Sequence, residues 1–167
     1  MTKNILIISA TSRSNLELSN KIHDITKSIN SNCELINIED YDIPLYTPIL
    51  QKDGIPESVK NLTPKFIEAS GFIISAPEYN GSIPPALTNL IAWISVSTDQ
   101  WREVFNGKKA LIGTHSGGGG NNFIQSMKIQ LGHLGAIVLP RTIVVNSYTK
   151  FDKDSTKDKI QQLNELL

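Results

Sequence analysis

The sequence contains little that points away from an ordinary globular protein. A single cysteine, Cys33, excludes an internal disulfide and fits a reducing compartment such as the cytoplasm. Its place beside the apolar run Leu35–Ile38 favours a buried structural thiol over a reactive one. The 16 basic and 16 acidic residues leave no net charge and no basic stripe, which argues against nucleic acid or an anionic membrane as a partner. The apolar run near the N-terminus, Ile5 to Ala10, is too short for a secretory signal or a membrane span. We therefore expect a cytoplasmic protein without membrane association.

The apolar content is sufficient for one folded domain. The 167 residues are 40% hydrophobic and 19% charged, which is the composition of a globular protein with a sizeable core. No linker, repeat or low-complexity segment divides the chain. We expect residues 1–167 to form a single domain.

Short apolar runs predict the strands of a sheet that is covered on both faces. They are Ile5–Ser9, Leu35–Ile38, Phe72–Ile74, Lys109–Thr114, and a fifth strand, Ile137–Leu139 with Thr142–Val145, that Pro140 interrupts. Apolar residues at helical spacing lie between and after these runs, and alternating strands and helices predict an α/β fold with a parallel sheet. Pro64 weakens the helix expected around it, Glu39–Pro56 reads as an irregular connection, and Gly135 can end a helix.

The loop after the first strand has the composition of a phosphate-binding site. Thr11, Ser12 and Ser14 carry hydroxyls, Asn15 carries an amide, and Arg13 carries a guanidinium. The N-terminus of the following helix adds free N–H groups and a positive dipole end. An alternative remains open, in which Ser14 or Asn15 simply caps the helix and Arg13 lies in solvent.

The loop after the third strand, from Ser75 to Pro85, organises the rest of the predicted site. Tyr79 offers an aromatic face, Asn80 a donor and an acceptor, and Gly81 a close backbone approach. Glu78 is a candidate general base, but no second carboxylate lies near it in the loop. A capping role or a backbone hydrogen bond is therefore favoured for Glu78. Ser82 is the expected N-cap of the next helix, with Pro84 and Pro85 in its first turn.

The loop after the fourth strand begins at His115 and contains Gly117–Gly120. It matches neither a Walker loop, nor a dinucleotide fingerprint, nor a nucleophile elbow. A glycine-rich turn without a ligand is the alternative here. Because parallel strands end at one edge of a sheet, we expect this loop and the two others to converge. The histidines lack the spacing of a metal site.

The segment Pro77–Asn89 closely resembles the Pro-Glu-Tyr-Asn loop of the NADPH-dependent FMN reductase family. These are flavodoxin-like proteins that include quinone, chromate and azo-dye reductases. Weaker similarity extends through Arg13, the glycine-rich loop and Leu134–Pro140. The resemblance implies a flavodoxin-like three-layer sandwich with strand order 2-1-3-4-5, FMN as cofactor and NADPH or NADH as co-substrate. It also implies a small-molecule electron acceptor, a ping-pong cycle, and a homodimer or homotetramer.

The resemblance also assigns roles to the loop residues. Thr11 and Arg13 occupy phosphate-loop positions, and the other residues fall into two groups. The first, Pro77, Glu78, Tyr79, Asn80, Gly81 and Ser82, would hold one edge and face of the isoalloxazine; the second, His115, Ser116, Gly117 and Gly118, would approach its pyrimidine side. No catalytic side chain is expected, because hydride chemistry resides in a flavin.

The chain departs from the family pattern at two positions. Ala10 replaces a usual glycine, and Leu16 stands where a polar residue is common, so the phosphate site would depend on Ser14 and Asn15. A flavin-free binding protein on the same fold therefore remains an alternative. An electron-carrier flavodoxin is a second alternative. Such carriers use a strong net charge to dock on partner proteins, whereas this chain has no net charge, which favours the reductase.

Overall fold

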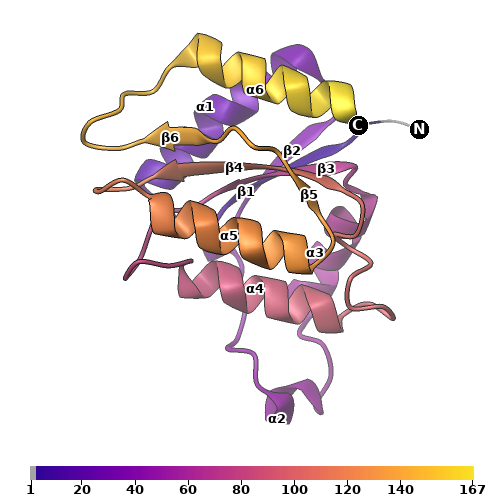
Figure 1. The fold of residues 1–167 in the computed structure, drawn as a ribbon. Coiled ribbons are helices and arrows are strands. Elements are labelled where there is room, and N and C mark those ends of the chain that lie inside the picture. Colours follow the sequence, from indigo (N-terminus) through magenta and orange to yellow (C-terminus); the bar gives the residue numbers. More distant parts are fainter. Residues whose placement is uncertain (1–2) are drawn as a thin grey trace.

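The computed structural model describes residues 3–167 and contains one parallel sheet with helices on both faces (Figure 1). The strand order is β2-β1-β3-β4-β5, and β6 also pairs with β4. The strands are β1 (Ile5–Ser9), β2 (Cys33–Asn37), β3 (Gly71–Ser75), β4 (Lys109–His115), β5 (Ile137–Val138) and β6 (Ile143–Val145). The predicted order and fold class are confirmed.

The fifth position of the sheet is shared by two short strands. β5 pairs with Lys109 and Ala110 at the start of β4, and β6 pairs with Gly113–His115 at its end. Pro140 lies between them and has no N–H to donate to the sheet. The expected break in this strand is thus confirmed.

Two groups of helices sandwich the sheet. The helices are α1 (Ser14–Ile29), α2 (Pro48–Gln51), α3 (Glu57–Glu68), α4 (Pro85–Val96), α5 (Asn121–His133) and α6 (Lys153–Leu166), with a 3-10 turn, η1, at Ile38–Asp40. Figure 1 shows α1 and α6 on one face and α3, α4 and α5 on the other. The short α2 projects beyond α4. None of the described helices is long and apolar enough to cross a membrane.

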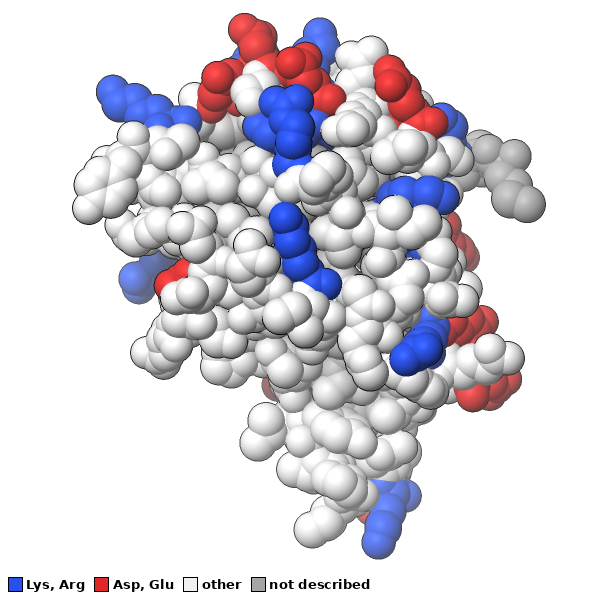
Figure 2. Space-filling view, viewed as in Figure 1, with Lys and Arg blue, Asp and Glu red and all other residues white. Residues whose placement is uncertain are grey.

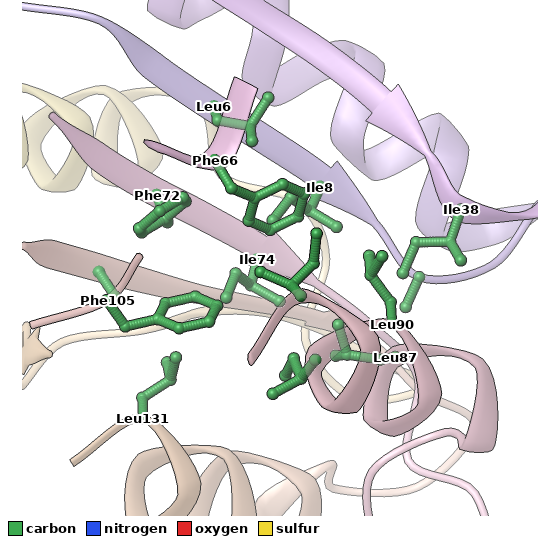
Figure 3. Close-up of a cluster of buried hydrophobic side chains, with 14 of the residues drawn as sticks. Leu6, Ile8, Ile38, Phe66, Phe72, Ile74, Leu87, Leu90, Phe105 and Leu131 are labelled. Atoms are coloured by element: carbon green, nitrogen blue, oxygen red, sulfur yellow. The ribbon is translucent and has the colours of Figure 1, made fainter. Parts of the chain in front are cut away.

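Alternating residues of the strands pack into two separate hydrophobic cores, one on each face of the sheet. In β1, Leu6 and Ile8 pack toward α3, α4 and α5, whereas Ile5 and Ile7 pack toward α1 and α6. Figure 3 shows the first of these clusters, in which Leu6 and Ile8 lie with aromatic rings such as Phe72 between the sheet and the helices. Burial on both faces explains why the central strands are continuous apolar runs.

The structure corrects three details of the sequence-based picture. The second strand is Cys33–Asn37, and Ile38 already belongs to η1. Helix α3 continues through Pro64, because its buried face is anchored in the core by residues such as Leu62 and Phe66. Cys33 is half-buried rather than fully buried, and desolvation raises the pKa of its thiol.

Candidate functional site

Asn15 joins the loops that follow β1 and β4. Its amide donates to the carbonyl oxygen of His115 at 2.8 Å, and its Oδ1 accepts from the His115 N–H at 2.9 Å. The hydroxyl of Ser75, at the end of β3, donates to the same Oδ1 at 3.2 Å. One buried side chain thus links the start of α1 to the ends of β3 and β4, and the predicted convergence of the loops is confirmed. Asn15 is 3% exposed, so its side chain supports these loops from within the fold.

Glu78 caps the N-terminus of α5 from the neighbouring loop. Its Oε2 accepts from the N–H groups of Asn122 at 2.9 Å and Phe123 at 3.2 Å. Such donors have no acceptor within a helix, and a carboxylate also suits the positive end of the helix dipole. The favoured sequence interpretation of Glu78, a cap rather than a general base, is confirmed.

Ser116 ties the same two loops together at a second point. The N–H of Glu78 donates to Ser116 Oγ at 2.9 Å, and Thr114 Oγ1 lies 2.8 Å from that oxygen. Ser116 is 5% exposed. Its hydroxyl therefore holds the backbone of the Pro-Glu-Tyr-Asn loop in place and is not free to face a ligand.

The tip of that loop is a tight hairpin turn. Tyr79 and Ser82 exchange backbone hydrogen bonds of 3.1 and 2.9 Å. Between them Asn80 (φ 50°) and Gly81 (φ 71°) both adopt the left-handed conformation that an Asn-Gly turn favours. Tyr79 stays 48% exposed at the turn, while Pro77, two residues earlier, is buried. The hairpin therefore presents an aromatic surface on a rigid base.

The expectation that Ser82 caps α4 is wrong. The helix begins at Pro85 with Pro84 as its N-cap residue, and no side chain of the cap accepts a hydrogen bond. The backbone of Ser82 is already paired in the hairpin turn. Each residue that precedes a proline is disfavoured from helical geometry, which keeps Ile83 and Pro84 extended.

The four glycines after His115 have different functions. Gly120 has φ 72°, and a Cβ there would lie 2.9 Å from Thr114 Cγ2, so the entry into α5 requires glycine. At Gly117 and Gly118 a Cβ would meet nothing within 4 Å. Both residues are exposed, so their backbone is accessible to a flat ligand.

The N-terminus of α1 is not capped by a side chain. Its N-cap residue is Arg13, with φ 65° and ψ −132°, and no side chain forms a capping bond. The first intrahelical bond of this turn runs from the Glu17 N–H to the Arg13 carbonyl oxygen. Arg13 and Ser14 are exposed, Ser12 is half-buried, and Thr11 is 6% exposed. The turn thus combines a strained cationic residue with N–H groups that lack an intrahelical acceptor.

A fourth loop, after β2, also reaches this turn and was missed by the sequence reasoning. Glu39 Oε2 accepts from the Ser12 N–H at 2.9 Å, and Asn37 Nδ2 lies 3.3 Å from Ser12 Oγ. β2 is the neighbour of β1, and both end at the same edge. The rule that placed the other three loops together would have predicted this one too.

Within residues 3–167, no group of three or more histidine, cysteine or acidic residues could hold a metal ion. His23 lies in α1 and His133 in α5.

A family model covers most of the chain. The model for NADPH-dependent FMN reductase matches residues 3–150, which include all four loops. The chain belongs to the NADPH-dependent FMN reductase family. The sequence-based identification of the family is confirmed.

Curated relatives match this family member over about half of its length. A quinone reductase of Escherichia coli is 42% identical over 78 residues, which is 46% of this chain and 40% of that protein. A 2-hydroxy-1,4-benzoquinone reductase of a Burkholderia species is 36% identical over 85 residues, or 50% of this chain and 45% of that enzyme. The matched segments thus span less than half the length of these relatives.

Solved structures share the fold at low sequence identity. The flavoenzyme FerB, an NAD(P)H:acceptor oxidoreductase from Paracoccus denitrificans, has a TM-score of 0.71 at 20% identity, covering 99% of this chain and 95% of that one. RosB, solved with a flavin-derived intermediate, has a TM-score of 0.75 at 15% identity, with coverages of 98% and 78%. These values establish a shared flavodoxin-like fold.

Proposed function

We propose that this member of the family is an NAD(P)H-dependent, FMN-containing oxidoreductase. It would pass electrons from NADPH or NADH to a small acceptor, such as a flavin, a quinone, an azo compound or chromate. The observation that carries the proposal is the uncapped N-terminus of α1, held by Asn15 at the same sheet edge as the hairpin that carries Tyr79. An anion site beside an aromatic surface suits a ligand that has a phosphate at one end and a flat ring at the other.

The first turn of α1 fits a phosphate group. Helix geometry leaves its leading N–H groups without intrahelical acceptors, and Arg13 adds an exposed guanidinium. The Ala10 departure does not obstruct the loop, because its methyl group is 0% exposed and belongs to the core cluster under α3, α4 and α5. Ser12 and Ser14 would add hydroxyl donors, and Thr11 would contribute backbone groups.

The other two loops fit a tricyclic ring. The exposed Tyr79 ring and the Asn80-Gly81 turn offer one face and edge, with Pro77 and Glu78 holding the turn from below. The open backbone at Gly117 and Gly118, together with His115, offers the polar edge. Ser116 and Ser82 act through the backbone arrangement that they fix.

Bound FMN would supply the redox chemistry, accepting a hydride from NADPH and passing electrons to the acceptor. The protein residues bind and orient in this scheme. Glu78, the one carboxylate of the hairpin loop, is engaged in capping α5, so we assign no catalytic side chain. Donor and acceptor would use the same open place beside Tyr79 in turn, which is a ping-pong cycle.

An electron carrier on the same fold is the second candidate, and an archaeal flavodoxin is among the structural neighbours, with a TM-score of 0.64 at 13% identity. Such a protein would bind FMN without oxidising NADPH. The balance of 16 basic and 16 acidic residues does not favour docking driven by charge.

The test is a turnover assay on protein that has been loaded with FMN and freed of excess flavin. NADPH consumption that depends on added benzoquinone supports the reductase. Retained flavin without NADPH consumption supports the carrier, and no retained flavin supports a flavin-free binding protein. A panel of free FMN, an azo dye and chromate then ranks the acceptors.

The proposed homo-oligomer would use the face of α4 and α5. Figure 2 shows few charged side chains over these helices, in contrast to the charged surface over α6. A groove of about 510 Å³ lies here, and its lining includes Ile83, Ile129 and His133. Ile129 is 73% exposed. Apolar exposure of this kind is typical of an interaction surface. Because Ile83 directly follows the Tyr79–Ser82 hairpin, a second copy of the chain bound here would border the proposed flavin site.

Light scattering after size exclusion tests the proposed interface. Ile129→Glu should convert a dimer or tetramer to a smaller species. Ile67→Glu is the matched control, because Ile67 is also an exposed helical isoleucine but lies on α3, outside the groove. An unchanged mass for Ile129→Glu would refute the interface.

We also propose a cytoplasmic location, supported by the free Cys33 thiol. In addition, we propose that residues 1–167 act as one flavin-binding domain.

A further inference from the structure

The carboxylate of Glu39 sits on the loop that would receive the FMN phosphate. Its Oε2 accepts from the backbone N–H of Ser12 at 2.9 Å. Ser12 directly precedes Arg13, the N-cap residue of α1. A negatively charged side chain thus already uses one of the donors that a phosphate would need.

Neighbouring residues hold this arrangement in place. Asn37, which is 5% exposed, donates to Asp40 Oδ1 at 2.8 Å and lies 3.3 Å from Ser12 Oγ. Glu39 and Asp40 belong to η1, the short turn that follows β2 directly. The backbone of Glu39 is therefore placed next to the Ser12 turn by the end of a strand that pairs with β1.

Glu39 is charged at neutral pH. Hydrogen bonds from the side chain and the backbone of Ser12, with a smaller contribution from the charge of Arg13, hold the pKa of Glu39 below its usual value. The same Arg13 would attract a phosphate. Carboxylate and phosphate would thus draw on the same two residues.

We propose that the carboxylate of Glu39 competes with the phosphate group of bound FMN for the Ser12 N–H. Glu39 closes the phosphate loop when no flavin is present and lowers the affinity for phosphorylated flavin. The inference rests on the proposed FMN-binding function and deepens it, because it makes FMN an exchangeable ligand of this protein.

Charge explains why the two groups exclude each other. One N–H can make one strong hydrogen bond, and a phosphate ester carries between one and two negative charges at neutral pH. Two anions within a few ångströms repel each other, so FMN binding requires that Glu39 leave the loop. Part of the phosphate binding energy is lost in this displacement.

Comparing FMN with riboflavin isolates the phosphate contribution, because riboflavin carries the same ring without the phosphate. Dissociation constants for both flavins would be measured by fluorescence quenching on wild type and Glu39→Gln. Removing the charge should tighten FMN binding about tenfold, which is the effect of one charge-assisted hydrogen bond. Riboflavin binding should be unchanged.

Asp40→Asn is the matched control, since it removes the same charge one residue away from a carboxylate that contacts Asn37 and not the Ser12 N–H. It should change the ratio of the two constants much less. If both variants change this ratio equally, the effect comes from the general electrostatic field of the turn and not from the contact of Glu39 with Ser12, and the proposal is overturned. A ratio that is unchanged or lowered in Glu39→Gln would also overturn it. If no variant binds FMN, the proposed function fails as well.

Discussion

The N-termini of α1 and α5 lie at the same edge of the sheet and follow strands of the same type, yet they are completed differently. At α5, the carboxylate of Glu78 satisfies two N–H groups from the adjacent loop. At α1, no side chain caps the helix, and its N-cap residue Arg13 has a strained positive φ. Glu39 contacts Ser12, the residue that precedes the N-cap.

This difference separates a helix end that is completed within the protein from one that we propose binds a ligand. The α5 terminus has its anion built in, and the same carboxylate fixes the hairpin that carries Tyr79. The α1 terminus keeps free donors, a cation and local strain, which are typical of a site where binding energy is recovered from a ligand. The two ends together would hold an aromatic surface beside the proposed anion site.

The largest expected effect comes from the residue that joins the two ends. Asn15→Ala removes the partners of the His115 N–H and carbonyl and of the Ser75 hydroxyl. Leaving such groups unpaired should lower the free energy of unfolding by about 2–3 kcal/mol. Urea denaturation measures this, with Asn20→Ala, exposed on the same helix, as the control. An equal effect of both changes would contradict the role of Asn15.

Removing the α5 cap should have the next largest effect. Glu78→Ala leaves the Asn122 and Phe123 N–H groups without their acceptor and should cost about 1–2 kcal/mol. The melting temperature should fall by about 2–4 °C per kcal/mol. Glu78→Gln retains an acceptor oxygen and should lose about half as much. If Glu78→Ala melts like wild type, the cap contributes nothing.

Relieving the strain at α1 should change stability and binding in opposite directions. Arg13→Gly suits the positive φ and should stabilise the flavin-free protein by about 1 kcal/mol. It also removes the guanidinium, so FMN should bind about tenfold more weakly. Arg13→Lys keeps both the strain and the positive charge and serves as the control. Thermal melts and flavin titrations on the same samples measure both effects. If Arg13→Gly is less stable than wild type, the backbone at Arg13 is not strained.

The smallest effect concerns acidification of the flavin-free protein. The pKa of Glu39 is lower in the folded protein than its usual 4.5, so this carboxylate stabilises the fold above pH 4.5. That stabilisation is lost as the pH falls further and the folded carboxylate becomes protonated. The stability difference between wild type and Glu39→Gln should therefore shrink on acidification. If the stability difference instead grows on acidification, folding does not lower the pKa of Glu39.

Sequence patterns predicted the elements whose residues have one dominant preference. The apolar runs of β1, β3 and β4 had to be buried on both faces, and their polar continuations had to share an edge. Gly135 ends α5 with φ 87°, as its position after Leu134 predicted. The capping role of Glu78 could be favoured because its loop contains no second carboxylate.

Other features depend on contacts between distant segments. Pro64 is tolerated because the buried face of α3 outweighs one lost backbone hydrogen bond, which periodicity cannot reveal. Ser82 looked like a cap, but its backbone is used by the Asn80-Gly81 turn. The contact of Glu39 with Ser12 spans 27 positions in the sequence. Sheet order alone could have suggested it, because β2 is the neighbour of β1.

The central claim is that these loops form one FMN site that accepts electrons from NADPH. The most direct test is an anaerobic titration of the FMN-loaded protein with NADPH, followed at the visible flavin band. The account predicts that the band bleaches at one equivalent of NADPH per bound flavin and returns when benzoquinone is added. A loaded protein whose band persists with excess NADPH would contradict the account.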